Sequence, residues 1–515
     1  MTSQRHAQEP VSKRELYLVF AGLMLALTLA SLDQNIVSTA LPRIVSDLGG
    51  LSHLSWVVTA FLVTSTTSTP LYGKLSDMYG RKPLFFTAIL IFLAGSILCG
   101  LAQTMFQLIV FRAIQGLGAG GLMTLAQTTV GDLIAPRERG RYQGLFGAVF
   151  AACSVAGPLL GGILTDALSW RWIFYVNLPV GAAALFLIAI GLRHHCHEVR
   201  HRIDYPGAGF LTCGTVCLLL FLSWGGSTYP WLSPIMIALV IFTVLFYGLL
   251  IRQEGRATEP ILPPHLFTNR VFIVAVSVIG LNAMALFGSL VFLPLFFQLV
   301  LGASPSHAGL MMAPMMGGVI VASVTGGRLV SATGRYKIFP VIGLATATCA
   351  FLALAWASFN SLGLPVIESA LVALGCGLGL VMPNLTVAIQ NSVERTDLGI
   401  ATSVSGFIRS LGGALGVALA GMVVAVRLRS LLPASWLLHS PTGSSLLELG
   451  VQQINQIPAE QHTILVNAYR HAIATTFLTG AGAAMLAFTI VLFLPERPLR
   501  LISNDARKTS EPTAY

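Results

Sequence analysis

The chain has 515 residues, of which 55% are apolar and only 10% are charged. Soluble domains usually carry about 25% charged residues, so the composition excludes an ordinary water-soluble enzyme and indicates an integral membrane protein. The net charge of +10 does not indicate a nucleic-acid partner, because the Lys and Arg residues are scattered in short groups between apolar runs.

A membrane-spanning helix needs about 20 mostly apolar residues. The first apolar run follows basic residues but lacks a small-residue cleavage site, so we expect a retained span rather than a signal peptide. Fourteen stretches satisfy the length condition: 16–38, 54–73, 84–102, 106–132, 142–165, 172–192, 207–224, 232–251, 271–300, 308–330, 338–357, 364–390, 398–425 and 471–493. The sequence therefore predicts an all-α membrane protein with 14 transmembrane helices.

Positive charge is distributed unevenly between the connections. The two ends of the chain and every second connection hold 23 of the 30 Lys and Arg residues, whereas the alternate connections hold five. Because Lys and Arg are retained on the cytoplasmic side, we expect a multi-pass protein of the plasma membrane with both termini in the cytoplasm.

Three segments recur after 254 to 259 residues. Residues 73–81 return as 327–335, residues 116–123 return as 375–382, and residues 157–161 return more faintly as 412–416. Internal duplication is common in secondary transporters. The repeats predict five parts: a cytoplasmic N-terminus (1–15), a six-helix half (16–192), a linker with two inserted helices (193–270), a second six-helix half (271–493) with an outer loop (427–470), and a cytoplasmic tail (494–515).

The connection between the second and third spans carries Gly73, Asp77, Gly80 and Arg81. It resembles the signature loop of the major facilitator superfamily. The resemblance implies that Asp77 faces the N-terminus of the thirteenth span and that Arg81 reaches Asp132, so that the loop latches the two halves together in one state. A basic loop held inside by topology alone would not explain the two glycines or the acid.

The fourth span contains Arg112, and a guanidinium in hydrocarbon costs about 2.5–3.5 kcal/mol. Its segment, residues 112–121, resembles the second signature of the superfamily, which is associated with proton coupling. Residues 32–42 resemble the first-span signature of drug:proton antiporters and supply Asp33 as a partner. A buried carboxylate beside a fixed cation is a candidate proton site; the alternative is a static pair in which Asp33 only neutralises Arg112.

The fifth span contains Gly157, Pro158, Gly161 and Gly162, which resemble the antiporter-specific signature, although Cys153 stands where that pattern usually begins with glycine. With residues 170–179 and the fourteen spans, the chain resembles the fourteen-span drug:proton antiporter family. The resemblance implies two six-helix halves, two inserted helices, and proton-coupled multidrug efflux of amphiphilic or hydrophobic small molecules, antibiotics among them, by alternating access. Dedicated export of one metabolite, siderophore or lipid is the alternative, and a membrane-embedded enzyme is disfavoured.

Several polar residues have no single predicted role. Glu368 is a candidate second proton or cation site or a boundary residue, and Arg409 has no assigned role. The histidines of residues 194–201 lie in a short basic connection, so we expect no metal site there, and no cofactor or ATP-binding loop is expected elsewhere. Candidate cavity residues are the membrane amides, which also join helices by hydrogen bonds: Gln34, Asn35, Gln115, Asn282, Gln298 and Asn384.

The expected partners follow from the same reading. They are a small-molecule substrate, protons and the lipid bilayer, without nucleic acid. The outer loop 427–470 is a candidate surface for a further partner.

Overall fold

The computed structural model describes residues 13–49, 54–192, 204–226, 229–432 and 459–499. In this part of the chain the α-helices are α1 (Lys13–Leu48), α2 (Leu54–Tyr79), α3 (Arg81–Leu101), α4 (Met105–Leu133), α5 (Pro136–Ala167), α6 (Trp172–Tyr175), α7 (Asn177–Gly191), α8 (Tyr205–Trp224), α9 (Pro234–Glu254), α10 (Arg270–Leu299), α11 (Pro305–Met311), α12 (Ala313–Thr333), α13 (Ile338–Phe359), α14 (Leu364–Gly379), α15 (Met382–Ser392), α16 (Leu398–Leu431) and α20 (Ala459–Val491). Two short 3-10 helices are η2 (Pro264–Thr268) and η3 (Arg395–Asp397).

Every predicted span coincides with a helix or with two consecutive helices, as with α6 and α7, α11 and α12, and α14 and α15. Among the described residues, 13 helical stretches are long and apolar enough to cross a membrane. The predicted span that is not among these 13 stretches is 54–73, which lies in α2 and carries a run of hydroxyl residues, 64–69. These hydroxyls donate to the carbonyls of their own helix, for example Thr67 to Val63 at 2.9 Å and Thr69 to Ser65 at 2.7 Å. Such internal bonds satisfy the polar groups inside the bilayer.

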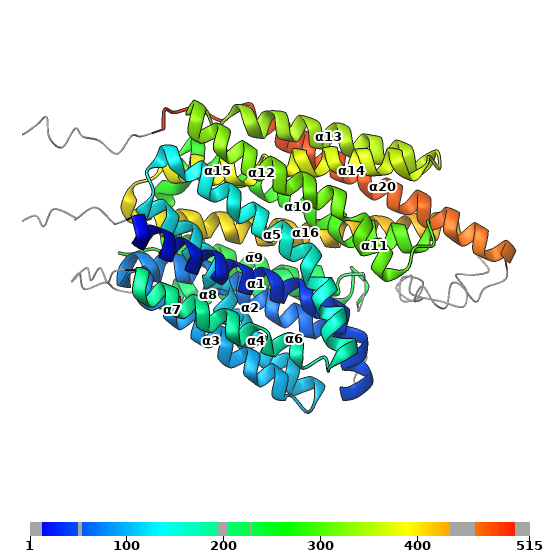
Figure 1. The fold of residues 1–515 in the computed structure, drawn as a ribbon, viewed down its shortest axis with the longest axis horizontal. Helices are drawn as coiled ribbons and strands as arrows, with labels where there is room; N and C mark the ends of the chain where they lie inside the picture. Colours follow the sequence, from blue (N-terminus) through cyan, green and yellow to red (C-terminus); the bar gives the residue numbers. More distant parts are fainter. Residues whose placement is uncertain (1–12, 50–53, 193–203, 227–228, 433–458, 500–515) are drawn as a thin grey trace, which may run out of the picture.

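The long helices pack into two groups (Figure 1). The first group, α1 to α7, is blue to teal, and the second group, α10 to α20, is green to orange. We call the end of the bundle where α1 begins and α20 ends the proximal end, and the opposite end the distal end. The proximal end is the left side of Figure 1.

The repeated glycines lie at corresponding helix crossings. A Cβ atom on Gly116 of α4 would lie 2.6 Å from the carbonyl oxygen of Phe61 in α2, and one on Gly375 of α14 would lie 2.8 Å from the carbonyl carbon of Met315 in α12. Only glycine permits such close backbone approach. The same crossing thus occurs once in each group, which supports the predicted duplication.

The inserted helices pack as a pair against one side of the bundle. Helix α8 contacts α2 of the first group and α16 of the second, whereas α9 packs mainly on α8. Leu211 of α8 and Phe407 of α16 share a small apolar cluster, and the hydroxyls of Thr59 and Ser223 lie 3.1 Å apart between α2 and α8. The insertion therefore bridges both groups.

Candidate functional site

The Asp33 carboxylate on α1 lies against the Arg112 guanidinium on α4. Arg112 Nη1 donates to Asp33 Oδ2 at 2.6 Å, and both residues are almost fully buried, with exposed fractions of 0% and 1%. Gln115 Nε2 and Asn177 Nδ2 donate to Asp33 Oδ1 at 2.8 and 2.9 Å. Three donors thus converge on one carboxyl group, which is the arrangement that stabilises an ionised acid.

The Arg112 guanidinium also has partners other than Asp33. Its Nε donates to the Val57 carbonyl at 3.3 Å, Nη1 donates to Gln115 Oε1 at 2.8 Å, and its centre lies 4.1 Å from the Phe61 ring. Removing one partner of a buried ion pair leaves an uncompensated charge and is strongly destabilising. The pair is therefore a preorganised site in which a change of protonation would alter several contacts together.

Sequence reasoning assigned no role to two members of this network. Asn177 begins α7, and Ser96 of α3 accepts from Gln115 at 3.0 Å and from Asn177 at 2.9 Å while donating to the Phe174 carbonyl. Asn177 follows a run of aromatic residues that looks like an ordinary membrane-boundary anchor. The sequence feature that could have identified Asn177 was a polar amide near the start of a predicted span.

The proximal end carries the contacts that the signature-loop resemblance implies. Asp77 Oδ1 accepts from the backbone N–H of Gly399 at 3.1 Å, and Oδ2 accepts from Ile400 at 2.8 Å, both in the first turn of α16. Arg81 Nη2 lies 2.6 Å from Asp77, and its Nε donates to Asp132 Oδ2 at 2.7 Å. One carboxylate therefore joins the first group to a helix N-terminus of the second, where negative charge is favourable.

The local structure explains why positions 73 and 80 of this loop are glycine. Gly80 has a φ of 89°, a left-handed conformation that favours glycine, between α2 and α3. Gly73 packs directly on Ser403 of α16, so a side chain at position 73 would collide with it while the proximal end is closed. The loop is thus shaped for this close contact.

The repeat counterpart makes a weaker neutral contact. Ser331 stands where Asp77 stands in the first repeat, and its hydroxyl accepts from the Arg141 backbone N–H at 3.1 Å. Arg139 Nη1 also crosses between the groups and donates to the Gln390 carbonyl at 3.1 Å. Both pseudo-equivalent corners are closed at the proximal end, and in the first-repeat corner an acid, Asp77, lies at a helix N-terminus of the other group.

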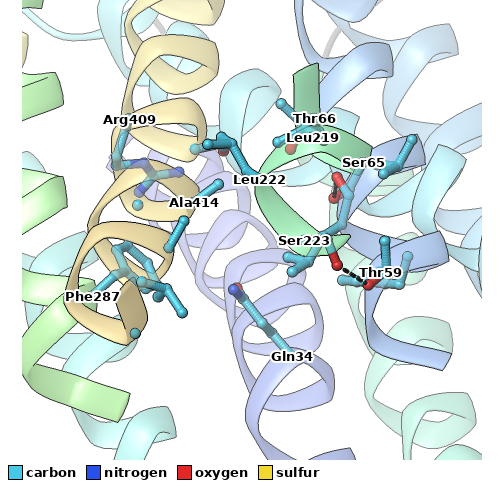
Figure 2. Close-up of a pocket in the computed structure, with 18 of the residues that line it drawn as sticks. Gln34, Thr59, Ser65, Thr66, Leu219, Leu222, Ser223, Phe287, Arg409 and Ala414 are labelled. Atoms are coloured by element: carbon cyan, nitrogen blue, oxygen red, sulfur yellow. Dashed lines mark hydrogen bonds between the residues drawn. The ribbon is translucent and has the colours of Figure 1, made fainter. Parts of the chain in front are cut away.

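A cavity of about 830 Å³ lies between the groups. Its lining follows α16 from Gly406 to Arg429 and includes residues of α1, α2, α4, α8 and α10. Because Arg429 is in the last turns of α16, the cavity extends toward the distal end. Figure 2 shows Gln34 of α1 and Arg409 of α16 pointing into this space, with Phe287 and Ala414 beside them. With the proximal contacts formed, the arrangement is a chamber closed at the proximal end.

The six candidate cavity amides differ in position. Gln34 lines the large cavity, whereas Gln115 belongs to the Asp33 network. The other four do not line the described cavities in this conformation: Asn35, Asn282, Gln298 and Asn384. Asn35 and Asn384 donate to carbonyls of their own helices, those of Ser31 and Leu380. Asn35 and Asn384 therefore bond within their own helices in this state.

The glycines of the fifth span do not all serve the same purpose. A Cβ atom on Gly157 would lie 2.7 Å from the Asn35 Cβ, and one on Gly161 would lie 2.5 Å from the Ile36 carbonyl oxygen, so both face α1 closely. Nothing lies within 4 Å of a Cβ built on Gly162. Gly162 therefore makes no close helix contact in this conformation. Pro158 lies inside α5, which continues through it to Ala167.

The remaining candidates lie apart from the Asp33 network. Glu368 is half-buried in the first turns of α14, and it does not line the described cavities. Among the described residues no group of three or more His, Cys, Asp or Glu side chains could hold a metal ion. Residues 194–201 lie outside the described residues, as does most of the loop 427–470.

Comparisons with known proteins agree on one family. The model of the Major Facilitator Superfamily matches residues 23–417. The Multidrug transporter protein MdtP of Bacillus subtilis is 37% identical over 96% of this chain and 95% of that protein, and Multidrug resistance protein 3 of the same organism is 35% identical over 96% and 98%. Among solved structures, the proton:xylose symporter XylE has a TM-score of 0.65 at 14% identity over 95% and 98% of the two chains. The human organic anion transporter MFSD10 has a TM-score of 0.61 at 17% identity over 94% of this chain and all of that one.

Proposed function

Because this chain belongs to the major facilitator superfamily, we propose that it is a multidrug-type antiporter that exports amphiphilic or hydrophobic small molecules in exchange for protons. Relatives named as multidrug transporters match nearly its full length, which supports this reading. The protein lies in the plasma membrane with both termini in the cytoplasm, so the proximal end is cytoplasmic, and the two six-helix halves alternate around the cavity.

One observation carries the proposal: two consecutive residues of α1 serve different sites. Asp33 lies in the buried network with Arg112, and Gln34 lines the large cavity. A helix that joins an ionisable site to a substrate chamber can transmit a change at one to the other, because packed helices move as units. Protonation of Asp33 would release donors that now converge on it, and the resulting shift of α1 would act on the cavity wall.

Asp77, Arg81 and Asp132 then form the latch of the outward-facing state, with Gly73 and Gly80 allowing its close fit. Breaking these contacts would open the proximal end to the cytoplasm. Glu368 is the proposed secondary proton site, and it is the next residue to test if Asp33 is not the carrier.

The test uses purified protein in liposomes with an imposed pH gradient and a panel of amphiphilic compounds. Asp33→Asn should abolish gradient-driven accumulation because the carrier carboxyl is gone, and it should also lower stability because Arg112 loses its buried partner. Asp47→Asn, which changes another acid of α1 outside the network, is the matched control and should keep accumulation. Full proton-coupled transport by the Asp33 variant would reject it as the carrier and direct attention to Glu368.

The static-pair alternative predicts a different result. If Asp33 only neutralises Arg112, replacing both with neutral amides should restore transport, because no unpaired charge remains. If Asp33 carries the proton, the double variant regains stability but not coupling. Thermal unfolding and proton-driven uptake of the same preparations separate the two roles.

A further inference from the structure

Arg409 is a charged residue at membrane depth to which the proposed mechanism gives no role. It lies 11 residues after the start of α16, about 16 Å along the helix at 1.5 Å per residue, which is near the middle of a bilayer core. It lines both the large cavity and a smaller one of about 80 Å³ on its proximal side. The guanidinium thus stands at the floor of the chamber.

The described surroundings of Arg409 offer it little compensation. Its Nη2 donates to the Met123 thioether sulfur, which is a weak acceptor, and within the described ranges no ion pair involves it. Arg112, by contrast, has Asp33. A guanidinium at this depth is costly without a partner, and among the described residues Arg409 has no acid of the kind that Arg112 has in Asp33.

The described residues that line the whole cavity are likewise positively charged or neutral. Its described lining includes two cationic residues, Arg409 and Arg429, and no Asp or Glu. The remaining polar lining consists largely of hydroxyls and the Gln34 amide, and the apolar lining includes Phe287 and Phe292. The smaller cavity likewise has Arg409 and no acid among its described lining residues.

We propose that the cargo supplies the missing acid: the chamber selects amphiphiles that carry an anionic group, and Arg409 is the residue that binds it. This inference rests on the proposed export function and names its substrate class. A guanidinium binds a carboxylate through two parallel N–H donors, and the apolar tail of the cargo would pack against the aromatic side of the chamber near Phe287. A cationic amphiphile would find no described carboxylate in the lining.

The test compares three probes built on one aromatic scaffold: a carboxylic acid, its methyl ester and the corresponding primary amine. Binding to the detergent-purified protein is measured at pH 7, and uptake into liposomes is measured with an imposed pH gradient and pH 7 outside. The acid should bind about tenfold more tightly than the ester, as expected for one charge-assisted contact, and the amine should bind most weakly. Arg409→Met should reduce the preference for the acid to twofold or less, and Arg409→Lys should retain part of it.

Arg427→Met is the matched control, because Arg427 is an exposed arginine of the same helix and does not line the cavity. It should keep the preference for the acid. The comparison of the three probes on the unmodified protein decides the question even if the Arg409 variants do not fold. Equal or tighter binding of the ester or amine would overturn the inference.

The outcomes also separate this inference from the proposed function. Gradient-driven uptake of the ester or amine in preference to the acid would refute anion selection and leave proton-coupled export standing. Absence of gradient-driven uptake for all three probes would count against both.

Discussion

The latch contact of Asp77 allows a quantitative prediction for Asp77→Asn. The carboxylate accepts two backbone N–H groups of α16, at 3.1 and 2.8 Å, and its side chain is only 10% exposed. Hydrogen bonds to charged groups contribute about 1.5–3 kcal/mol, and an acid at a helix N-terminus about 0.3–1 kcal/mol. An asparagine keeps one acceptor oxygen, so we expect a loss of about 2 kcal/mol, which raises the ratio of proximally open to proximally closed molecules about thirtyfold.

Ser331→Ala is the matched variant, because Ser331 occupies the corresponding position of the second repeat. It removes one neutral contact between the groups, from the Arg141 N–H at 3.1 Å, and one donation within its own helix, to the Gly327 carbonyl at 3.1 Å. Such a bond contributes about 0.5–1.5 kcal/mol, and the Arg137 donations to the backbone carbonyls of Ser331 and Ala332 remain. The ratio should therefore change less than about tenfold.

The assay is a distance measurement between spin labels on the two groups at the proximal end. Arg14, at the start of α1, and Arg335, between α12 and α13, are exposed and can be replaced by cysteine once the seven native cysteines have been removed. Double electron–electron resonance then reports the closed and open populations. Equal shifts for the Asp77 and Ser331 variants would refute the reasoning, as would an unchanged distribution in the Asp77 variant at unchanged thermal stability.

Two further predictions concern orientation and packing. Single cysteines at Arg335 and Asn360, at opposite ends of α13, should differ in intact cells: a membrane-impermeant thiol reagent should label position 360 and not 335, and the reverse pattern would invert the proposed topology. Gly161→Ala should lower the stability of the folded protein by about 1–3 kcal/mol because its Cβ meets α1, whereas Gly162→Ala should change it by less than about 0.5 kcal/mol. Melting of the two variants in detergent measures this difference, and equal losses would contradict the packing argument.

Much of the fold could be predicted because the bilayer imposes few solutions on a long apolar chain. Length and hydropathy located all fourteen helical regions, and even the hydroxyl-rich α2 was found, because its polar groups are short and bond to their own helix. The Asp33–Arg112 contact followed from the high cost of an unpaired charge in hydrocarbon. That cost leaves few arrangements for one acid and one cation on neighbouring helices.

The cavity lining was harder to predict because an amide has no comparable requirement for one partner. Asn384 donates to the carbonyl of Leu380 in its own helix, while Gln34 points into the chamber (Figure 2). Amino-acid composition does not distinguish an amide that bonds to its own helix from one that lines the cavity, because helix packing decides which side of a helix faces the cavity. Asn177 was missed for the same reason, and the contribution of α8 to the cavity wall depends on a tertiary contact that no local pattern specifies.

The position of α8 has a consequence for how cargo meets the lipid. Two bundles that rock against each other meet along two lateral seams, one on each side. On one side α8 lies over the seam between α2 and α16, with Leu219 and Ser223 in the chamber wall. On the other side α5 packs closely along α12, and nearer the chamber the Phe150 and Phe287 rings of α5 and α10 lie edge to face with their centres 6.3 Å apart. The two inserted helices therefore cover one seam and leave the other to the α5–α12 contact, so a compound dissolved among the acyl chains meets a different helical surface on each flank of the molecule.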